Sequence, residues 1–291
     1  MDEHFLPATR VPRVHEILRR RPQRGEASEH NASEHSPRID LAGAELELIL
    51  RSEFRAADRP WLMAVMVGSA DGAASIDGLS GSLGGEGDRR MFHAIRSLAD
   101  VILVGAGTAR SEGYRSPREG PGSSLRTGVG QRTSPRLALV SRSLDLDGIP
   151  ALEAGAVEDP ARLPYVICPA DADPGRIADL DGRAEVLPCG SGGEVDLEQA
   201  IVELGHRGEH IISCEGGPTL LGQLVGSDLI DEWLLTMSPT IVAGATGRIV
   251  AGGRADVRRL VLDRVMVHGD ELFCRYLRAD QSNSDAGITS S

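Results

Sequence analysis

The stretch "ISCEGGPTLLGQLV" (residues 212–225) joins an apolar run to a helix-like pattern through one acid and two glycines. Glycine accepts backbone dihedrals that are closed to other residues and lets a ligand approach the main chain closely. The first amides of the helix that follows are unpaired and carry partial positive charge. The junction is therefore suited to an anion, yet Glu215 places a carboxylate inside it.

A second junction of this kind is "VILVGAGTAR" (residues 101–110), which again reads as a strand, a glycine turn and a helix start. Ligands of open parallel sheets bind beyond the carboxyl ends of the strands, and two such junctions can clamp the two phosphates of a dinucleotide. Neither junction fits the G-x-G-x-x-G fingerprint, because Arg110 stands where a third glycine is expected. A standard Rossmann domain is therefore disfavoured.

The carboxylate of Glu215 has two readings. A carboxylate repels a pyrophosphate, so the side chain can face the other way, toward a substrate, where it accepts hydrogen bonds or passes a proton. It can instead do no more than favour the helix start electrostatically. The residue types alone leave both readings open.

Beyond Pro60, short apolar runs alternate with segments of helical length. Near-continuous apolar strands separated by helices predict a largely parallel sheet that is buried on both faces, and the last two strands predict an antiparallel hairpin at one edge. The predicted strands are 61–67, 100–105, 136–141, 165–168, 184–187, 210–214, 231–239, 258–269 and 271–277, and the predicted helices are 88–98, 196–206 and 218–227.

The ends of the chain differ in composition from this central part. Residues 1–40 are polar and without periodicity, and we expect residues 21–38 in particular to be disordered. Apolar residues near helical spacing predict a helix over 41–57. The chain is thus divided into an extension (1–57), a single domain (58–280) and a disordered tail (281–291).

Composition excludes several classes of function. A net charge of −12 argues against binding of nucleic acid. The sequence contains no lysine, so no lysine acts as a Schiff base or a phosphate anchor. Its four irregularly spaced cysteines predict free thiols and neither a zinc site nor disulfides. No apolar run reaches the length of a membrane span and the first residues lack a signal-peptide pattern, so we expect a cytoplasmic protein without a membrane partner.

The chain from about Pro60 to Leu277 resembles the reductase domain of the bifunctional riboflavin-biosynthesis deaminase/reductase proteins (RibD). The matching stretches, in order and spacing, are "RPWLMAVMVGSADGAAS" (59–75), "DRRMFHAIRSLADVILVGAGTARSEGY" (88–114), "IISCEGGPTLLGQLVGSDLIDEWLLTMSPTIVAG" (211–244) and the closing hairpin. The resemblance implies a dihydrofolate-reductase-like α/β fold of about nine strands and a homodimer. It also implies NADPH as hydride donor and 5-amino-6-(5-phosphoribosylamino)uracil as the small-molecule substrate, whose ribosyl group is reduced to a ribityl chain.

Carried over position by position, the resemblance also implies site residues. Glu215 becomes the catalytic acid beside the reactive carbon, and Ser80 and Arg96 face the substrate. Arg115, or else Arg118, replaces a substrate-binding arginine of the family. Ser141 and Arg142 are candidates for the 2′-phosphate that distinguishes NADPH from NADH. The implied cofactor-binding residues are Gly68, Gly105, Gly107, Thr108, Glu112, Ser141, Arg142, Gly216, Gly217, Pro218, Thr219 and Leu220.

These assignments have simpler competitors. Arg96 can pair with Glu86 or with another surface acid, and Ser141 with Arg142 can be an ordinary strand exit. A single G-x-G-T turn, such as the one that contains Thr108, is more often an ordinary strand-to-helix loop than a cofactor site.

The sequence also departs from the family pattern, mainly on the substrate side. The H-x-E…P-C-x-x-C zinc signature of the deaminase half is absent, so the chain can perform only the reduction. Val65 stands where many members carry a lysine, Ser82-Leu83-Gly84 replaces "W-I-[ST]", and "EGYRSPREG" (112–120) replaces "D-D-P-x-L-T-x-R". Two alternatives follow: an NADPH-dependent reductase of another C=N substrate such as dihydrofolate, and a non-catalytic NADPH-binding module.

Overall fold

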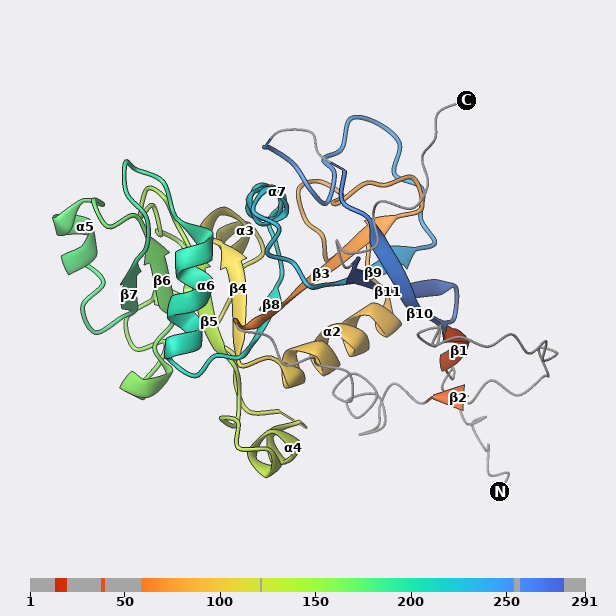
Figure 1. The fold of residues 1–291 in the computed structure, drawn as a ribbon, viewed down its shortest axis with the longest axis horizontal. Coiled ribbons are helices and arrows are strands. Elements are labelled where there is room, and N and C mark those ends of the chain that lie inside the picture. The colour runs from red at the N-terminus through yellow and green to blue at the C-terminus, as the bar shows by residue number, and fades with distance from the viewer. Residues whose placement is uncertain (1–13, 20–37, 40–58, 121, 254–256, 280–291) are drawn as a thin grey trace, which may run out of the picture.

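The computed structural model describes residues 14–19, 38–39, 59–120, 122–253 and 257–279. Within these residues, eleven strands form one sheet in the order β2-β1-β10-β11-β9-β3-β8-β4-β5-β6-β7 (Figure 1). The strands are β1 (Val14–Arg19), β2 (Arg38–Ile39), β3 (Trp61–Ser69), β4 (Val101–Gly105), β5 (Arg136–Val140), β6 (Tyr165–Cys168), β7 (Glu185–Pro188), β8 (Ile211–Cys214), β9 (Glu232–Ser238), β10 (Leu260–His268) and β11 (Glu271–Arg278). The helices are α2 (Glu86–Leu98), α3 (Ala106–Ser111), α4 (Ser123–Gly128), α5 (Pro174–Ala178), α6 (Leu197–His206) and α7 (Pro218–Gly226), with short 3-10 turns at Pro150–Leu152 and Pro160–Arg162.

The sheet has a parallel half and an antiparallel half. The strands from β9 to β7 in the sheet order pair in parallel, and β11, β10, β1 and β2 pair antiparallel. All nine predicted strands are confirmed, and so is the closing hairpin β10–β11. The three predicted helices are confirmed as α2, α6 and α7, each within two residues of its expected ends.

Helices cover both faces of the sheet, as near-continuous apolar strands require. One face of the parallel half packs on α6 and α7, through residues such as Leu62, Leu204 and Leu221. The opposite face packs on α3 and the segment around Leu152, and further along the sheet on α2, through Met91. No helix of the described residues is long and apolar enough to cross a membrane.

Helix α2 depends on the closing hairpin for its first turn. It has no side-chain cap from its own N-cap residue, Gly85. Instead, the buried carboxylate of Glu271, at the start of β11, accepts bonds from the amides of Gly85 (2.7 Å), Gly87 (3.0 Å) and Asp88 (3.3 Å). A Cβ added at Gly87 would lie 2.7 Å from the same carboxylate, so the missing side chain makes room for the cap. The hairpin thereby fixes where α2 begins.

No strand is predicted from the sequence before residue 61, and this is wrong at two places. Residues 14–19 pair with β10, and residues 38–39 pair with residues 14–15. An edge strand such as β10 has unpaired backbone N–H and C=O groups, which can pair with another strand almost regardless of the sequence of that strand. A pairing made by the main chain leaves no hydrophobic periodicity to detect. The predicted helix over 41–57, most of the stretch 21–38 and the tail 281–291 lie outside the described residues.

We expect Glu271→Ala to lower the free energy of unfolding by about 1–2 kcal/mol, because it leaves helix amides without an acceptor. Urea unfolding followed by circular dichroism measures this change. The matched control is Glu86→Gln, which alters an exposed acid of the same helical turn and should change stability by less than about 0.5 kcal/mol. Equal midpoints for the two variants would contradict the assigned cap.

Candidate functional site

The two glycine turns predicted from the sequence touch each other. The first joins β4 to α3 and the second joins β8 to α7. The amide of Gly105 donates to the carbonyl of Gly216 at 2.9 Å. A Cβ at Gly217 would lie 2.2 Å from the hydroxyl oxygen of Thr108, so the two turns can meet only because residue 217 lacks a side chain. Gly216 has a φ of +88°, which also favours glycine, and the peptide bond to Gly217 is cis.

The predicted cofactor residues lie along one edge of the sheet. Strands β3, β8, β4 and β5 are neighbours and parallel, so their carboxyl ends lie at the same edge of the sheet. Gly68 and Gly105 lie in the last residues of β3 and β4, and Gly216 and Ser141 follow β8 and β5. Helix α7 starts at Pro218, and its N-cap Gly217 supplies no side-chain hydrogen bond. The Cβ position of Gly107 faces open space. Gly107 is exposed, Gly105 is half-buried, and Gly216 and Gly217 are buried. Uncapped helix amides are groups that can bind the phosphates of a dinucleotide.

Of the twelve predicted cofactor residues, Thr108 and Glu112 line the pocket described below and the other ten do not. Ser141 and Arg142 are two of these ten. Ser141 is buried at the end of β5, and its amide donates to Ile167. The exposed guanidinium of Arg142 pairs with Glu194 at 3.0 Å. Both belong to the same sheet edge as the glycine turns, but neither lines that pocket.

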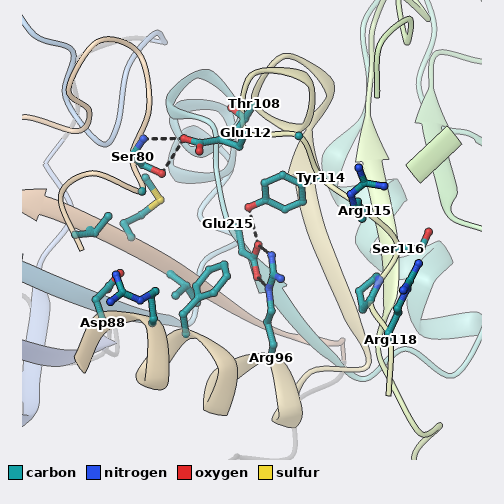
Figure 2. Close-up of a pocket in the computed structure, with 18 residues that line it drawn as sticks. Ser80, Asp88, Arg96, Thr108, Glu112, Tyr114, Arg115, Ser116, Arg118 and Glu215 are labelled. Carbon is teal, nitrogen blue, oxygen red and sulfur yellow. Dashed lines mark hydrogen bonds and ion pairs between the residues drawn. The ribbon is translucent and has the colours of Figure 1, made fainter. Parts of the chain in front are cut away.

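A pocket of about 540 Å³ opens beside the glycine turns, between α2, β3 and the loop that follows α3 (Figure 2). It brings together seven residues predicted from the sequence: Ser80, Arg96, Thr108, Glu112, Arg115, its alternative Arg118, and Glu215. Its other lining residues are Val65, Met66, Val67, Gly81, Asp88, Arg89, Phe92, Gly113, Tyr114, Ser116 and Pro117. The pocket therefore joins residues that are up to 150 positions apart in the chain, from Val65 to Glu215.

A bidentate ion pair lies at the middle of the pocket. Arg96 donates from Nε to Oε1 of Glu215 at 2.7 Å and from Nη2 to Oε2 at 2.6 Å. The hydroxyl of Tyr114 donates to Oε2 at 2.7 Å (Figure 2). The predicted alternative partner of Arg96 is wrong, because Glu86 pairs with Arg90 instead. The carboxylate of Glu215 thus contacts α2 and the loop after α3, which is the orientation expected if it faces a substrate.

The surroundings of this ion pair favour the charged arginine and the neutral phenol. Burial opposes the charge on Arg96, but the Glu215 carboxylate outweighs burial and raises the pKa of the guanidinium. The ring of Phe92 lies 4.2 Å from the guanidinium and that of Tyr114 lies 5.5 Å away. Burial, followed by the nearby charge of Glu215, raises the pKa of Tyr114 well above its usual value. Glu215 is therefore a rigid hydrogen-bond acceptor in the pocket.

Ser80 and Glu112, assigned separately to substrate and cofactor, contact each other. Oε1 of Glu112 accepts bonds from the amide of Ser80 (2.7 Å) and from its hydroxyl (2.9 Å). This contact ties the loop before α2 to the end of α3 and closes one side of the pocket (Figure 2).

Charged groups are separated along the pocket. Asp88 lies on one side of the Arg96–Glu215 pair, and Arg115 and Arg118 lie on the other (Figure 2). Among the described residues, no group of three or more His, Cys, Asp or Glu side chains is placed to hold a metal. All four cysteines are free and buried, as predicted.

Sequence reasoning missed Tyr114 and Asp88. Tyr114 belongs to the segment 112–120 that departs from the family pattern, and its only signal was an aromatic residue in a polar loop. Asp88 was not predicted as a site residue, because an acid in the first turn of a helix is common: its charge interacts favourably with the helix dipole.

All three tyrosines of the chain have a raised pKa in the fold: Tyr114 well above its usual value, Tyr165 to about 12 and Tyr276 by a smaller shift, in each case first through burial. In the unfolded chain a tyrosine has a pKa of about 10. Because folding raises this pKa, each tyrosine contributes to the free energy of unfolding below pH 10, and this contribution is lost as the pH rises through the pKa of the folded state. We therefore expect tyrosinate absorbance to appear above pH 10, together with loss of the folded state. Tyr114→Phe should remove one late-titrating phenol. If instead a tyrosine titrates near pH 10 and Tyr114→Phe abolishes this titration, the buried hydrogen bond from Tyr114 to Glu215 is contradicted.

Comparison with known proteins agrees with this architecture. A family model described as the RibD C-terminal domain matches residues 60–273. The 2,5-diamino-6-ribosylamino-4(3H)-pyrimidinone 5′-phosphate reductase of Methanothermobacter thermautotrophicus is 28% identical over 233 residues, covering 75% of this chain and 98% of that protein. The enzyme of the same name from Archaeoglobus fulgidus is 25% identical over 209 residues, covering 71% of this chain and 93% of that protein.

Among solved structures, a pyrimidine reductase-like protein from Corynebacterium diphtheriae superposes with a TM-score of 0.67 at 25% identity, covering 81% of this chain and 99% of that one. The sheet order and the closing hairpin confirm the predicted dihydrofolate-reductase-like fold. Because the family model spans most of the sequence, the chain belongs to the RibD C-terminal domain family.

Proposed function

We propose that the protein is an NADPH-dependent reductase that converts the ribosyl group of a ribosylaminopyrimidine 5′-phosphate to a ribityl chain. The observation that carries this proposal is the Arg96–Glu215–Tyr114 group, which fixes a carboxylate beside the two joined glycine turns. The names of the archaeal relatives support the same reaction class. The substrate expected from the family resemblance is the deaminated pyrimidine, whereas the names of the archaeal relatives specify the 2,5-diamino form. The two compounds share the ribosylamino group and the phosphate.

The edge of the sheet supplies the cofactor contacts of this proposal. The backbone from Gly216 to Leu220 would hold phosphates, Gly105, Gly107 and Thr108 would border them, and Gly68 would lie by the nicotinamide. Ser141 and Arg142 would bind the 2′-phosphate. For that contact Arg142 must leave Glu194, and an exposed pair of this kind costs at most about 1 kcal/mol to break.

The chemistry of the chain itself is positioning and exclusion of water. NADPH, when bound, would be the hydride donor for the ribosyl carbon of the opened, imine form of the substrate, and the imine nitrogen would take up a proton from water. Glu215 orients the neighbouring hydroxyl or N–H groups of the substrate as an acceptor, and Arg96 and Tyr114 hold it in place. The apolar side chains of Val65, Met66 and Phe92 line the same space and keep water out.

The end of the pocket that holds Arg115 and Arg118 fits the substrate phosphate. Both residues are exposed and line the pocket. Since the chain has no lysine, arginine is the only permanently charged side chain available for such an anion.

The reductase domain that we propose spans residues 58–280. A homodimer, expected from the family, is supported by exposed apolar side chains on β9 and β10. Met237 on β9 is 38% exposed, and Leu260 and Val261 on β10 are 40% and 43% exposed. Light scattering after size exclusion measures the assembly.

We expect NADPH to raise the melting temperature more than NADH does, because a ligand at about 100 times its dissociation constant stabilises the fold by about 2.7 kcal/mol. NADPH oxidation should follow addition of a ribosylaminopyrimidine 5′-phosphate. Glu215→Gln should lower kcat by about 100-fold through misplacement of the substrate and leave the NADPH-induced melting shift unchanged. Binding of NADPH without oxidation by either pyrimidine or by dihydrofolate would favour the non-catalytic module.

We expect Arg115→Ala and Arg118→Ala together to raise KM for the 5′-phosphorylated substrate by about tenfold or more, the effect of losing charge-assisted hydrogen bonds. Reduction of the dephosphorylated substrate should change little. Arg176→Ala is the matched control, because this exposed arginine bonds the carbonyl of Ser143, outside the pocket. An equal loss with both substrates would place the phosphate elsewhere.

A further inference from the structure

The pocket contains one carboxyl group that the proposed reaction does not use. Asp88 lies in the first turn of α2 and lines the pocket on the side away from Arg115 and Arg118 (Figure 2). Between these two sides stands the Arg96–Glu215 pair, beside which the ribosyl carbon is reduced. An acid, a reducing centre and a cationic end thus follow one another along the pocket.

Asp88 is half-buried, and no arginine in the described part of the chain forms an ion pair with it. Burial, followed by the neighbouring charge of Glu271, raises the pKa of Asp88, although the Thr236 side chain on β9 and the charge of Arg89 act in the opposite direction. Glu271 itself is occupied by the amides at the start of α2. Arg89 is the cation nearest in sequence, and its guanidinium reaches the carbonyl of Gly84 at 3.4 Å. A ligand that offers N–H donors would compensate the desolvated carboxylate.

Gly84 fixes where this carboxylate points. A Cβ added at Gly84 would lie 2.0 Å from Oδ2 of Asp88, so the loop backbone packs directly on the acid. This loop is the Ser82-Leu83-Gly84 segment, in which the chain departs from the family pattern. The departure and the acid therefore form one local structure.

Pyrimidines before and after deamination differ at the edge that an acid would read. A 2-amino-4-oxopyrimidine offers two adjacent donors, the ring N3–H and the 2-amino group, which match the two oxygens of a carboxylate. After deamination, a carbonyl oxygen replaces the amino group. A carboxylate then meets one donor and one acceptor, and the second contact is repulsive.

We infer that Asp88 binds the N3–H and 2-amino edge of the pyrimidine ring and makes the protein a reductase of the undeaminated 2,5-diaminopyrimidinone. This inference rests on the proposed function and deepens it. The ring lies at the Asp88 end, the ribosyl group beside Glu215 and the phosphate at Arg115 and Arg118. A hydrolytic deamination at C2 of the ring is then the class of reaction that consumes the product.

The test compares NADPH oxidation with 2,5-diamino-6-ribosylamino-4(3H)-pyrimidinone 5′-phosphate and with the corresponding 5-amino-6-ribosylaminouracil 5′-phosphate. Wild-type protein should prefer the diamino compound in kcat/KM by at least about tenfold, the value of one hydrogen bond to a charged group. Asp88→Asn, which keeps the size of the side chain, should reduce this preference at least about tenfold. Equal kcat/KM for both pyrimidines in the wild type overturns the inference.

Two further variants separate a specific effect from a general one. Gly84→Ala keeps the charge of Asp88 but displaces its carboxylate, and it should also reduce the preference. Glu86→Gln removes an acid of the same helical turn outside the pocket and should leave the preference unchanged. NADPH should raise the melting temperature of all three variants as it does in the wild type. Full preference retained in Asp88→Asn overturns the assignment.

Failure of the proposed function gives a different pattern. If neither ribosylaminopyrimidine is reduced, the proposed reaction is wrong, and calorimetric titration of both compounds in the presence of NADP+ decides the inference by binding alone. A tenfold tighter binding of the diamino compound that Asp88→Asn abolishes supports it, and equal binding overturns it. Dihydrofolate carries the same donor edge without the ribosyl phosphate. Its reduction, sensitive to Asp88→Asn but not to the Arg115 and Arg118 changes, would support the role of Asp88 for another substrate.

Discussion

The bidentate ion pair between Arg96 and Glu215 joins the parts of the protein that have to act together. Glu215 belongs to the second glycine turn, and Arg96 belongs to α2. The pair therefore fixes the distance between the cofactor edge of the sheet and the helix that forms the opposite wall of the pocket. Burial makes this arrangement costly to break, because either partner alone would leave an uncompensated charge. Tyr114 adds a third element, the loop after α3, to the same contact.

Glycine has a second structural role beside its role in ligand approach. Residue 217 lacks a Cβ where the hydroxyl of Thr108 lies, and residue 87 lacks one where the carboxylate of Glu271 lies. In both places a polar side chain from a distant segment occupies the space of the missing side chain. The glycines thus determine which parts of the chain meet, and the pocket depends on both contacts.

The elements that could be predicted from the sequence are those with a local signal. The apolar runs of the nine central strands and the two glycine turns have such signals, and the family resemblance located Ser80, Arg96 and Glu215 in one pocket. The mutual contact of Ser80 and Glu112 could not be predicted, because it depends on the packing of two loops 32 residues apart. Nor could the pairing of residues 14–19 with β10, which the main chain makes without a side-chain pattern. The places of Tyr114 and Asp88 in the pocket could not be predicted either, because a tyrosine in a loop and an aspartate at a helix start are both common without any role in a site.

The cap that Glu271 places on α2 has a consequence for the order in which the protein becomes functional during its synthesis. The four strands of the cofactor edge and both glycine turns are complete once the chain has grown to Gly226. The first turn of α2, which carries Asp88, acquires its cap only when the final strand leaves the ribosome. A nascent chain can thus complete both glycine turns well before the wall of the pocket that carries Asp88. If the proposed role of Asp88 holds, recognition of the pyrimidine is the last property that the growing chain gains.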